Sequence, residues 1–395
     1  MMTSDTMMRQ LQLSDRFRTF PTYPLADVPL IKRDLLAKGV DVIDLGAGDA
    51  DLAPPPAAVQ ALTQAATKPA LGRYAFQLGL PAYREAVSAW MLKRFGVKLD
   101  PFKEILPLVG SKEGIAHVAF CYVGPGDITI LPDPGYQPYV GGTLLAGGQG
   151  YAVPLRPEND YLIRLDEIPD EVVRKARILY LNYPNNPTAA IAPRNYIESA
   201  LEFCRENGIL LVYDNAYSEV AFDGYIPPSI FEFDGAREVA IEFHSFSKTY
   251  NMTGWRIGWA AGNADSIAAL SRVKAFVDTG QFMAVQAAAA AALESYDTWV
   301  PQNIQVFRQR RDTLTQALRA AGFDARAPQA TMYLWVPVPE GVKSEAFARR
   351  ALLEQGVVIM PGAALGAGGE GFFRLALTQS EERLAEAAQR LARLR

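Results

Sequence analysis

The chain has 395 residues, and its 39 basic and 43 acidic side chains give a formal net charge of −4. This length predicts two or three domains of ordinary size. The near-neutral charge argues against a nucleic-acid-binding or polybasic membrane-binding protein, because both need a concentrated positive field. Apolar residues make up 49% of the chain and charged residues 21%, which is typical of a folded globular protein. We therefore expect a compact protein that acts on small molecules, with neither nucleic acid nor membrane as a partner.

Few side chains suited to disulfides or metals are present. The only cysteines are Cys121 and Cys204, too few for a disulfide scaffold or a four-cysteine metal site. The only histidines are His117 and His244, which argues against a histidine-rich metal centre and a Ser-His-Asp hydrolase. The N-terminus lacks the apolar core of a signal peptide, and no segment approaches the ~20 apolar residues of a membrane span. We expect a cytoplasmic protein without a bound metal.

The first two thirds of the chain predict an arm, a short helix and strand, and a long alternation of strands and helices. Residues 1–14 are polar and irregular and predict an N-terminal arm. Helical spacing over 27–38 and an apolar run over 40–45 precede a proline-rich break at 53–56. Beyond this break, strands are expected at 105–109, 128–131, 150–154, 178–181, 210–213 and 239–243, with helices at 81–95 and 111–121. Such alternation is typical of a buried, mostly parallel sheet, so we predict an α/β fold with a large domain over 53–294.

The remaining part of the chain predicts a different architecture. Six consecutive alanines at 287–292 favour a closely packed helix, and a charged helix is expected over 303–321. The other expected elements are extended segments at 332–338 and 372–377 and helices at 344–355 and 380–394. We predict that this α+β tail packs beside the N-terminal strand, so that residues 15–52 and 295–395 form one smaller domain.

The segment from His244 to Arg256 (HSFSKTYNMTGWR) is the most informative for function. It follows an apolar strand, and ligands of open α/β sheets bind where strands end. Lys248 lies beside small hydroxyl residues, with an arginine eight positions later. This combination can bind a phosphate and offer an amine for Schiff-base chemistry. A solvated loop has the same composition, so Lys248 alone is weak evidence.

Two more strand ends carry compatible side chains. Asp214 lies just beyond an apolar strand, with Tyr217 three residues later. A carboxylate there can hold a pyridinium proton and keep a cofactor ring electron-poor, although aspartate is equally a common helix N-cap. Asn186, in the sequence NYPNNPT, follows another strand and can donate to a phenolate oxygen, although Asn-Pro is also an ordinary turn.

A strand-to-helix turn and an aromatic residue complete the pattern. In the sequence VGSKEG, Ser111 and Lys112 open a helix whose backbone N–H groups can cradle a phosphate. Tyr136, in the sequence DPGY, follows a further strand and can stack on a flat cofactor. Five strand ends with compatible roles around one phosphorylated pyridine aldehyde rarely coincide by chance. Together they favour a cofactor site over five unrelated loops.

These motifs resemble those of class I/II aminotransferases of the pyridoxal-phosphate fold-type I family. The similarity covers nearly the whole chain, and the string from Ser245 to Arg256 is highly specific when joined to NPT at 186–188 and to Asp214 and Tyr217. The resemblance implies pyridoxal 5′-phosphate as cofactor and a homodimer with shared active sites. It also implies a ping-pong transfer of an amino group between an L-amino acid and a 2-oxo acid.

The resemblance implies a role for each site residue. Lys248 forms the Schiff base with the cofactor and then acts as base and acid in the proton shift, while Asp214 pairs with the pyridinium nitrogen. Asn186 and Tyr217 bind the cofactor's 3-oxygen. The other residues implied around the cofactor are Ser111, Lys112, Ser245, Ser247 and Arg256 at the phosphate, Tyr74 from the second subunit, and Tyr136 on the ring. The residues implied for substrate binding are Arg374, which grips the α-carboxylate, with Gly48, Tyr23 and Asn186.

Within the family, the chain is most similar to the LL-diaminopimelate aminotransferase group, through strings such as YNMTGW at 250–255. This similarity implies LL-diaminopimelate as the first donor to test, 2-oxoglutarate as acceptor and a place in lysine biosynthesis. The sequence departs from the group's pattern at Ala189, where glycine is usual, and at Ala50, where proline is usual. Phe276 replaces an asparagine that contacts the distal end of diaminopimelate, and the carboxylate expected near Gln77 is not obvious. These departures leave open an apolar or differently charged substrate.

Other functions remain open at this point. The donor can be aspartate, alanine, or an aromatic or branched amino acid. A pyridoxal-phosphate lyase acting on a C–S bond is a second interpretation, because the residues identify the electron sink better than the fate of the carbanion. A cofactor-binding domain without turnover is a third, against which the presence of both Lys248 and Asp214 weighs.

Overall fold

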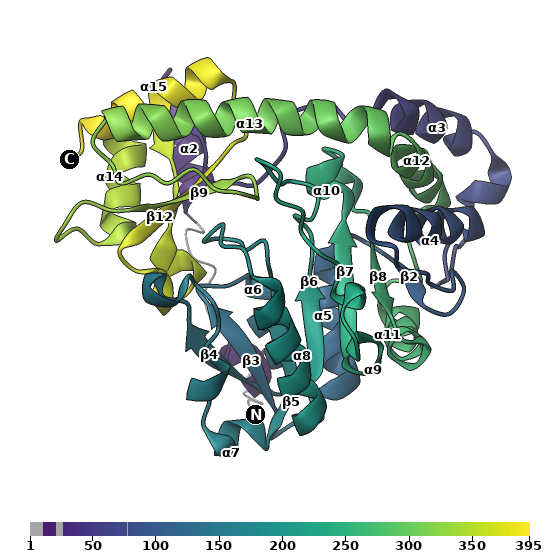
Figure 1. The fold of residues 1–395 in the computed structure, drawn as a ribbon. Coiled ribbons are helices and arrows are strands. Elements are labelled where there is room, and N and C mark those ends of the chain that lie inside the picture. Colours follow the sequence, from purple (N-terminus) through teal and green to yellow (C-terminus); the bar gives the residue numbers. More distant parts are fainter. Residues whose placement is uncertain (1–10, 21–26, 77) are drawn as a thin grey trace, which may run out of the picture.

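The computed structural model describes residues 11–20, 27–76 and 78–395, and its centre is a seven-stranded sheet (Figure 1). The strands are β2 (Ile105–Leu108), β3 (Ile128–Asp133), β4 (Gln149–Pro154), β5 (Ala176–Leu181), β6 (Leu210–Asp214), β7 (Ala240–Ser245) and β8 (Gly258–Gly262). Their order across the sheet is β2-β8-β7-β6-β5-β3-β4. Strands β4, β3, β5, β6 and β7 run parallel, and β8 runs antiparallel to both of its neighbours. The expected α/β fold with a mostly parallel sheet is confirmed.

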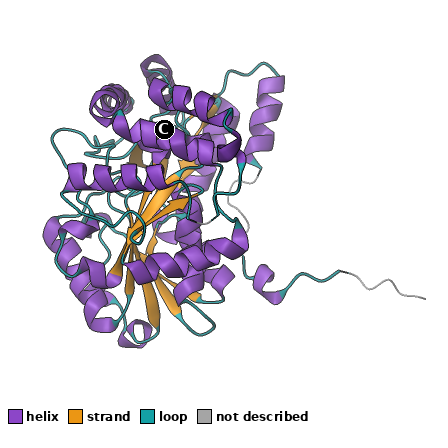
Figure 2. Ribbon diagram, turned by 90° about the vertical axis from the view of Figure 1, so that its right-hand side faces the viewer, coloured by secondary structure: helices purple, strands orange, loops and turns teal. Residues whose placement is uncertain are grey.

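Helices cover both faces of this sheet (Figure 2). On one face, α8 (Arg194–Asn207) buries Ile197, Leu201 and Cys204 against the sheet. The helices on the other face are α5 (Ser111–Tyr122), α6 (Gln137–Ala146) and α11 (Ala264–Val277). Because both faces are covered, the central strands are buried along their length, which explains why their sequences are apolar without alternation.

Three helices pack together beside β2 and β8, at one edge of the sheet: α3 (Pro56–Ala66), α4 (Pro81–Phe95) and α12 (Met283–Glu294). The alanine run lies in α12, where Ala288, Ala289 and Ala292 are buried. Their small side chains let α3 approach closely, so the expected close packing is confirmed. Three short helices follow strands or lead into them: α7 (Asp170–Val173), α9 (Ala236–Val239) and α10 (Phe246–Thr249).

The smaller domain is built on two small sheets. Strands β11 (Met360–Pro361), β12 (Phe372–Ala376) and β9 (Tyr333–Pro337) form an antiparallel sheet, and β1 (Ile43–Asp44) pairs in parallel with β10 (Val357–Val358). The helices of this part are α2 (Val28–Ala37), α13 (Tyr296–Ala320), α14 (Ser344–Gln355) and α15 (Glu381–Ala392). The buried faces of α13, α14 and α15 share one core that includes Leu45, Phe307, Phe347 and Phe373, whereas α2 buries no residue. The N-terminal strand therefore does pack with the C-terminal tail.

Helix α13 joins the two parts of the molecule (Figure 1). Near its N-terminus, Trp299 Nε1 and Asn303 Nδ2 each donate to the carbonyl of Thr249 at 3.2 Å, next to the large sheet. Further along, Leu314 and Leu318 lie in the core of the smaller domain. The expected boundary between residues 294 and 295 coincides with the start of this bridging helix, and the domain boundaries stay a prediction.

Some elements differ from expectation. The strand β8 was not expected, because its sequence Gly-Trp-Ala-Ala-Gly lacks the β-branched residues that mark strands. The strand expected over 40–45 is only two residues long, since β10 offers it a two-residue partner. Of the expected N-terminal arm, residues 11–14 are exposed coil and residues 1–10 lie outside the described residues. The part of the chain that the structure describes includes no helix long and apolar enough to cross a bilayer.

Candidate active site

The carboxyl end of β6 carries Asp214, which is 4% exposed. Its Oδ2 accepts a hydrogen bond from the Tyr139 hydroxyl at 2.8 Å, while its Oδ1 is buried without a partner. Burial raises the pKa of Asp214 to about 6, because desolvation outweighs the hydrogen bond from Tyr139. A buried carboxylate with one oxygen unused fits a ligand that brings an N–H donor or a positive charge.

Lys248 lies in α10, one turn after the end of β7, and its Nζ donates to the carbonyl oxygen of Gly48. Gly48 must be glycine, since a Cβ there would lie 1.9 Å from the Tyr333 hydroxyl. Burial would raise the pKa of Tyr333, but the charges of Lys248 and Arg374 lower it below its usual value. The lysine therefore shares one small polar space with residues of the smaller domain.

Tyr217 contacts this space through Tyr333. Its hydroxyl donates to the Tyr333 hydroxyl at 3.3 Å, and the two rings meet edge to face with centroids 5.7 Å apart. Burial raises the pKa of Tyr217 well above its usual value. Tyr217 therefore stays a neutral hydrogen-bond donor in this space at ordinary pH.

Arg374 lies on β12 and is 5% exposed. One amino group donates to Asn186 Oδ1 and the other to the carbonyl of Gly46, both at 2.7 Å. The Tyr333 ring lies 4.1 Å from the guanidinium carbon. Within the described part of the chain Arg374 forms no ion pair, and its Nε is buried without a hydrogen-bond partner. A buried guanidinium without an anion is strongly suited to a carboxylate ligand, which it can bind through two parallel hydrogen bonds.

The N-terminus of α5 lies near the end of β7, because Ser245 pairs with Gly258 and a Cβ on Gly258 would lie 2.9 Å from the Ser111 nitrogen. The helix starts at Ser111, so its first backbone N–H groups have no carbonyl partner within the helix. Arg256 reaches over this end, and a Cβ on Gly110 would lie 2.4 Å from its guanidinium. The Ser245 hydroxyl accepts from the Ser247 backbone N–H at 3.1 Å at the start of α10. The open helix end and Arg256 are a geometry that binds phosphate.

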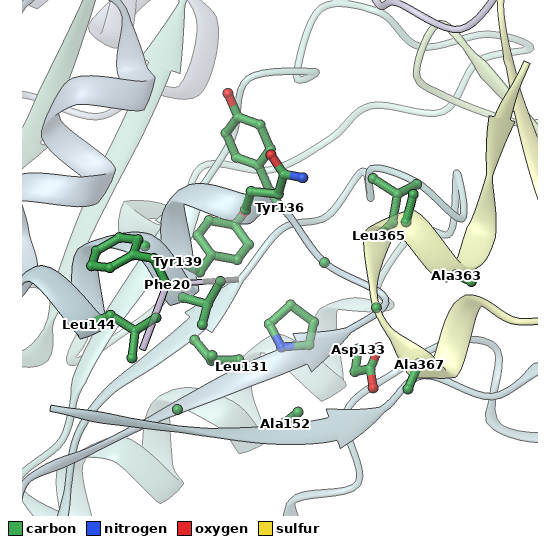
Figure 3. Close-up of a pocket in the computed structure, with 18 residues that line it drawn as sticks. Phe20, Leu131, Asp133, Tyr136, Tyr139, Leu144, Ala152, Ala363, Leu365 and Ala367 are labelled. Atoms are coloured by element: carbon green, nitrogen blue, oxygen red, sulfur yellow. The ribbon is translucent and has the colours of Figure 1, made fainter. Parts of the chain in front are cut away.

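Tyr136 precedes α6 and lies near Lys112, whose ammonium is 6.0 Å from its ring centroid. It lines a cavity of about 630 Å³ between α6 and residues 363–367 of the smaller domain (Figure 3). Asp133 lies at its edge, and its Oδ1 accepts from the Gly368 N–H at 2.9 Å. The two domains are thus joined beside the tyrosine that sequence reasoning assigns to the cofactor ring.

Two further residues that the sequence singles out, Tyr74 and Phe276, lie on the surface of the single chain. Tyr74 is 79% exposed, with its ring 6.1 Å from that of Phe76. Phe276, at the end of α11, is 93% exposed. Tyr23 and Gln77 lie outside the described residues.

The two alanine departures have different structural consequences. Ala189 adopts a φ of +59°, the left-handed region in which glycine is strain-free. The backbone therefore keeps the conformation that glycine would favour, at a cost of about 1–2 kcal/mol. Ala50 donates its N–H to the Thr253 hydroxyl at 3.4 Å, a bond that proline in this place would lack.

Sequence reasoning missed Tyr333 and Tyr139. Tyr333 lies in an extended segment that was expected, but nothing local marks its hydroxyl as part of a site. Tyr139 lies one turn after Tyr136, and only the fold brings it to Asp214. The one signal in the sequence was that Tyr139 follows Tyr136, the expected stacking residue, by three positions, which is close to one helical turn.

The donor set fits pyridoxal 5′-phosphate. The unused Asp214 Oδ1 suits a protonated ring nitrogen, and the open end of α5 with Arg256 suits a phosphate. The family model for class I and II aminotransferases matches residues 40–391. The chain belongs to this family and is a pyridoxal-phosphate-dependent aminotransferase.

Individual relatives agree with this assignment. An LL-diaminopimelate aminotransferase of Desulforudis audaxviator is 49% identical over 376 residues, which are 95% of this chain and 96% of the relative. Substrate-bound BacF from Bacillus subtilis has a TM-score of 0.93 at 33% identity, with 98% of both chains covered. A probable N-succinyldiaminopimelate aminotransferase from Thermus thermophilus has a TM-score of 0.88 at 38% identity, covering 93% of this chain and 98% of that one.

Proposed function

We propose that this aminotransferase moves an amino group from LL-diaminopimelate to 2-oxoglutarate. The observation that carries the reaction type is the buried Arg374 guanidinium, which forms no ion pair among the described residues. It packs on the ring of Tyr333, whose pKa the charge of Lys248 also lowers. Every α-amino acid and every 2-oxo acid brings the carboxylate that this arginine lacks. The choice of donor rests on relatives from several bacteria, 44–49% identical, that carry the name LL-diaminopimelate aminotransferase.

In this proposal the bound cofactor supplies an aldehyde that accepts the amino group and a ring that accepts electrons. Lys248 Nζ would hold the cofactor and, as a free amine, would take up and return the proton of the substrate Cα. Asp214 stays ionised beside the ring nitrogen. Asn186 and Tyr217 bind the ring's 3-oxygen.

The other assigned residues bind and orient. Arg374 fixes the α-carboxylate, which aligns the Cα–H bond with Lys248, and Gly48 leaves room for the substrate next to Tyr333. Tyr23 completes the substrate side. The residues at the phosphate are Ser111, Lys112, Ser245, Ser247 and Arg256, and Tyr136 stacks on the ring. The same site serves donor and acceptor in turn, which gives ping-pong kinetics.

We further propose a cytoplasmic homodimer. Tyr74 and Phe76 on one segment and Phe282 on another are 79%, 59% and 47% exposed, and residues 72–76 and 280–282 line one cavity. Exposed aromatic residues gathered on one surface are typical of protein interfaces. A second copy of the chain seated there brings its Tyr74 to the phosphate of its partner.

A second candidate is an aminotransferase for an amino acid with an apolar side chain. Phe276 favours it through the resemblance alone, because a phenyl ring at the position of the group's asparagine offers no hydrogen bond to a distal ammonium or carboxylate. A polar distal group left without partners costs about 1–3 kcal/mol of binding energy.

Stopped-flow visible absorbance of the purified holoenzyme tests the proposal. LL-diaminopimelate, N-succinyl-LL-diaminopimelate, glutamate, aspartate, leucine and phenylalanine are added one at a time, without an oxo acid. We expect the cofactor band to shift fastest with LL-diaminopimelate and to return on addition of 2-oxoglutarate. A shift only with leucine or phenylalanine selects the second candidate.

The variant Phe276→Asn sharpens the result. It is expected to raise kcat/KM for LL-diaminopimelate and not for glutamate. Pyruvate release from cystathionine without any oxo acid would contradict transamination and indicate a C–S lyase.

A further inference from the structure

Lys274, in the last turn of α11, is a buried lysine outside the assigned site. It is 1% exposed, and its Nζ donates to Glu113 Oε2 at 2.9 Å and to Asp278 Oδ2 at 3.0 Å. On its other oxygen, Glu113 lies 2.9 Å from His117 Nδ1. Ligand atoms of Glu113, His117 and Asp278 are close enough to hold a metal ion. The lysine ammonium bridges the two carboxylates and offsets one of their two negative charges.

Glu113 lies in the first turn of α5, so its charge acts on the helix end where the phosphate is proposed to bind. Its Oε2 accepts from the backbone N–H of Val109 at 3.0 Å, which fixes the turn around Gly110. Burial alone would raise the pKa of Glu113. The hydrogen bond to His117 and the charge of Lys274 outweigh burial and lower the pKa below its usual value, so the group is ionised at neutral pH. A carboxylate there competes with a phosphate for the positive end of the helix and repels it.

We propose that Lys274 is a positioning residue for the cofactor phosphate: it neutralises Glu113, so that the N-terminus of α5 stays available to the phosphate dianion. Glu113 can then hold the turn around Gly110 through its bond to Val109, while its negative charge no longer repels the phosphate. This inference rests on the proposed placement of the phosphate at α5.

Lys274 has a second possible role, which is to hold the backbone around Arg256 in place. Asp278 Oδ1 accepts from the Gly280 N–H at 2.7 Å, and Gln281 Nε2 donates to the Arg256 carbonyl oxygen. Loss of Lys274 could therefore act by moving Arg256 rather than by exposing a charge. The two roles differ in what they predict for Glu113, because removal of its charge takes one negative charge from beside the phosphate site while Lys274 stays paired with Asp278.

The test measures binding to the full-length apoenzyme by isothermal titration calorimetry. Pyridoxamine 5′-phosphate and pyridoxamine are the ligands, since neither forms a covalent bond with Lys248. The ratio of their dissociation constants isolates the contribution of the phosphate. The variants are Lys274→Met, Glu113→Gln and the double variant, and Lys93→Met is the matched control, because it breaks an exposed ion pair with Asp297.

We expect Lys274→Met to lower the preference for the phosphorylated ligand about tenfold and Glu113→Gln to raise it, with pyridoxamine affinity unchanged in both. The double variant is expected to return near the wild-type ratio, and Lys93→Met to equal wild type. Should Lys274→Met fail to fold, the gain in Glu113→Gln decides alone. A loss or no change in Glu113→Gln overturns the inference. A wild-type apoenzyme that does not prefer the phosphorylated ligand overturns the placement of the phosphate instead.

Discussion

The buried polar space around Lys248 and the exposed aromatic surface of Tyr74, Phe76 and Phe282 differ in how far one chain completes them. In the buried space, each charged group already has a defined position, and the unused atoms are few: Asp214 Oδ1 and Arg374 Nε. On the surface, three aromatic side chains meet solvent. The charges expected to fix cofactor and substrate therefore come from within one chain, whereas the aromatic surface is covered only in the proposed dimer.

The largest effect is expected from Lys248→Ala, which removes the amine and leaves Asp214 and Arg374 in place. Transamination should fall at least about 1,000-fold, because the amine proposed to carry the proton is lost. Absorbance spectra should lose the visible band of the bound cofactor, and thermal unfolding should stay within a few degrees of wild type. Unchanged colour and turnover would refute the role of Lys248.

Arg374→Lys keeps the positive charge but cannot form two parallel hydrogen bonds to a carboxylate. We expect kcat/KM for every amino donor to fall about 100-fold, since a bidentate carboxylate contact is lost and buried acceptors are left unpaired. Cofactor affinity, measured by fluorescence titration, should change less than twofold. A uniform loss of cofactor affinity would show that Arg374 supports the fold rather than the substrate.

Asp214→Asn separates function from stability. The pKa of Asp214 is raised to about 6 by burial, above about 3.9 for the unfolded chain, so this group destabilises the apoprotein increasingly as pH rises from 4 to 6. In chemical denaturation of the apoprotein, the variant should gain about 2–3 kcal/mol at pH 7.5 and almost nothing at pH 4. The holoenzyme should lose activity. A gain independent of pH would contradict this account.

Phe76→Asp tests the exposed surface. A charge buried in a dimer interface without a partner should raise the dimer dissociation constant at least about tenfold, measured by sedimentation velocity. Leu353→Asp, at a residue 50% exposed on α14, is the control. Equal dissociation of both variants would place the interface elsewhere, and a wild-type monomer would end the dimer proposal.

The smallest effect is expected from Ala189→Gly. Glycine relieves about 1–2 kcal/mol of strain at positive φ but costs about 0.4–1 kcal/mol of conformational entropy on folding. We expect a net gain of about 0.5 kcal/mol in the free energy of unfolding, measured by denaturant titration, with kcat unchanged. A loss of stability would indicate that the methyl group makes contacts worth more than the strain.

Local sequence was sufficient where strand, turn and functional residue are contiguous. The segments that end in Asp214 and Lys248 each contain an apolar strand and the side chain that follows it, and parallel strands bring such ends to one edge of the sheet. For this reason the fold class and the residues at the sheet edge could be predicted. The strand β8 could not, because glycine and alanine carry no strand signal and only its neighbours β7 and β2 make it one.

The amino-acid sequence is sufficient to identify the residue types at the strand ends, and through them the family. The distant partners of these residues follow from the folded chain alone: Tyr333 contacts Tyr217, Tyr139 contacts Asp214, and Lys274 contacts Glu113, which is 161 residues away. The physical reason is that burial, not local pattern, decides whether a hydroxyl or an ammonium must find a partner. Burial is a property of the packed chain, and it exists only once the two domains and their helices have come together.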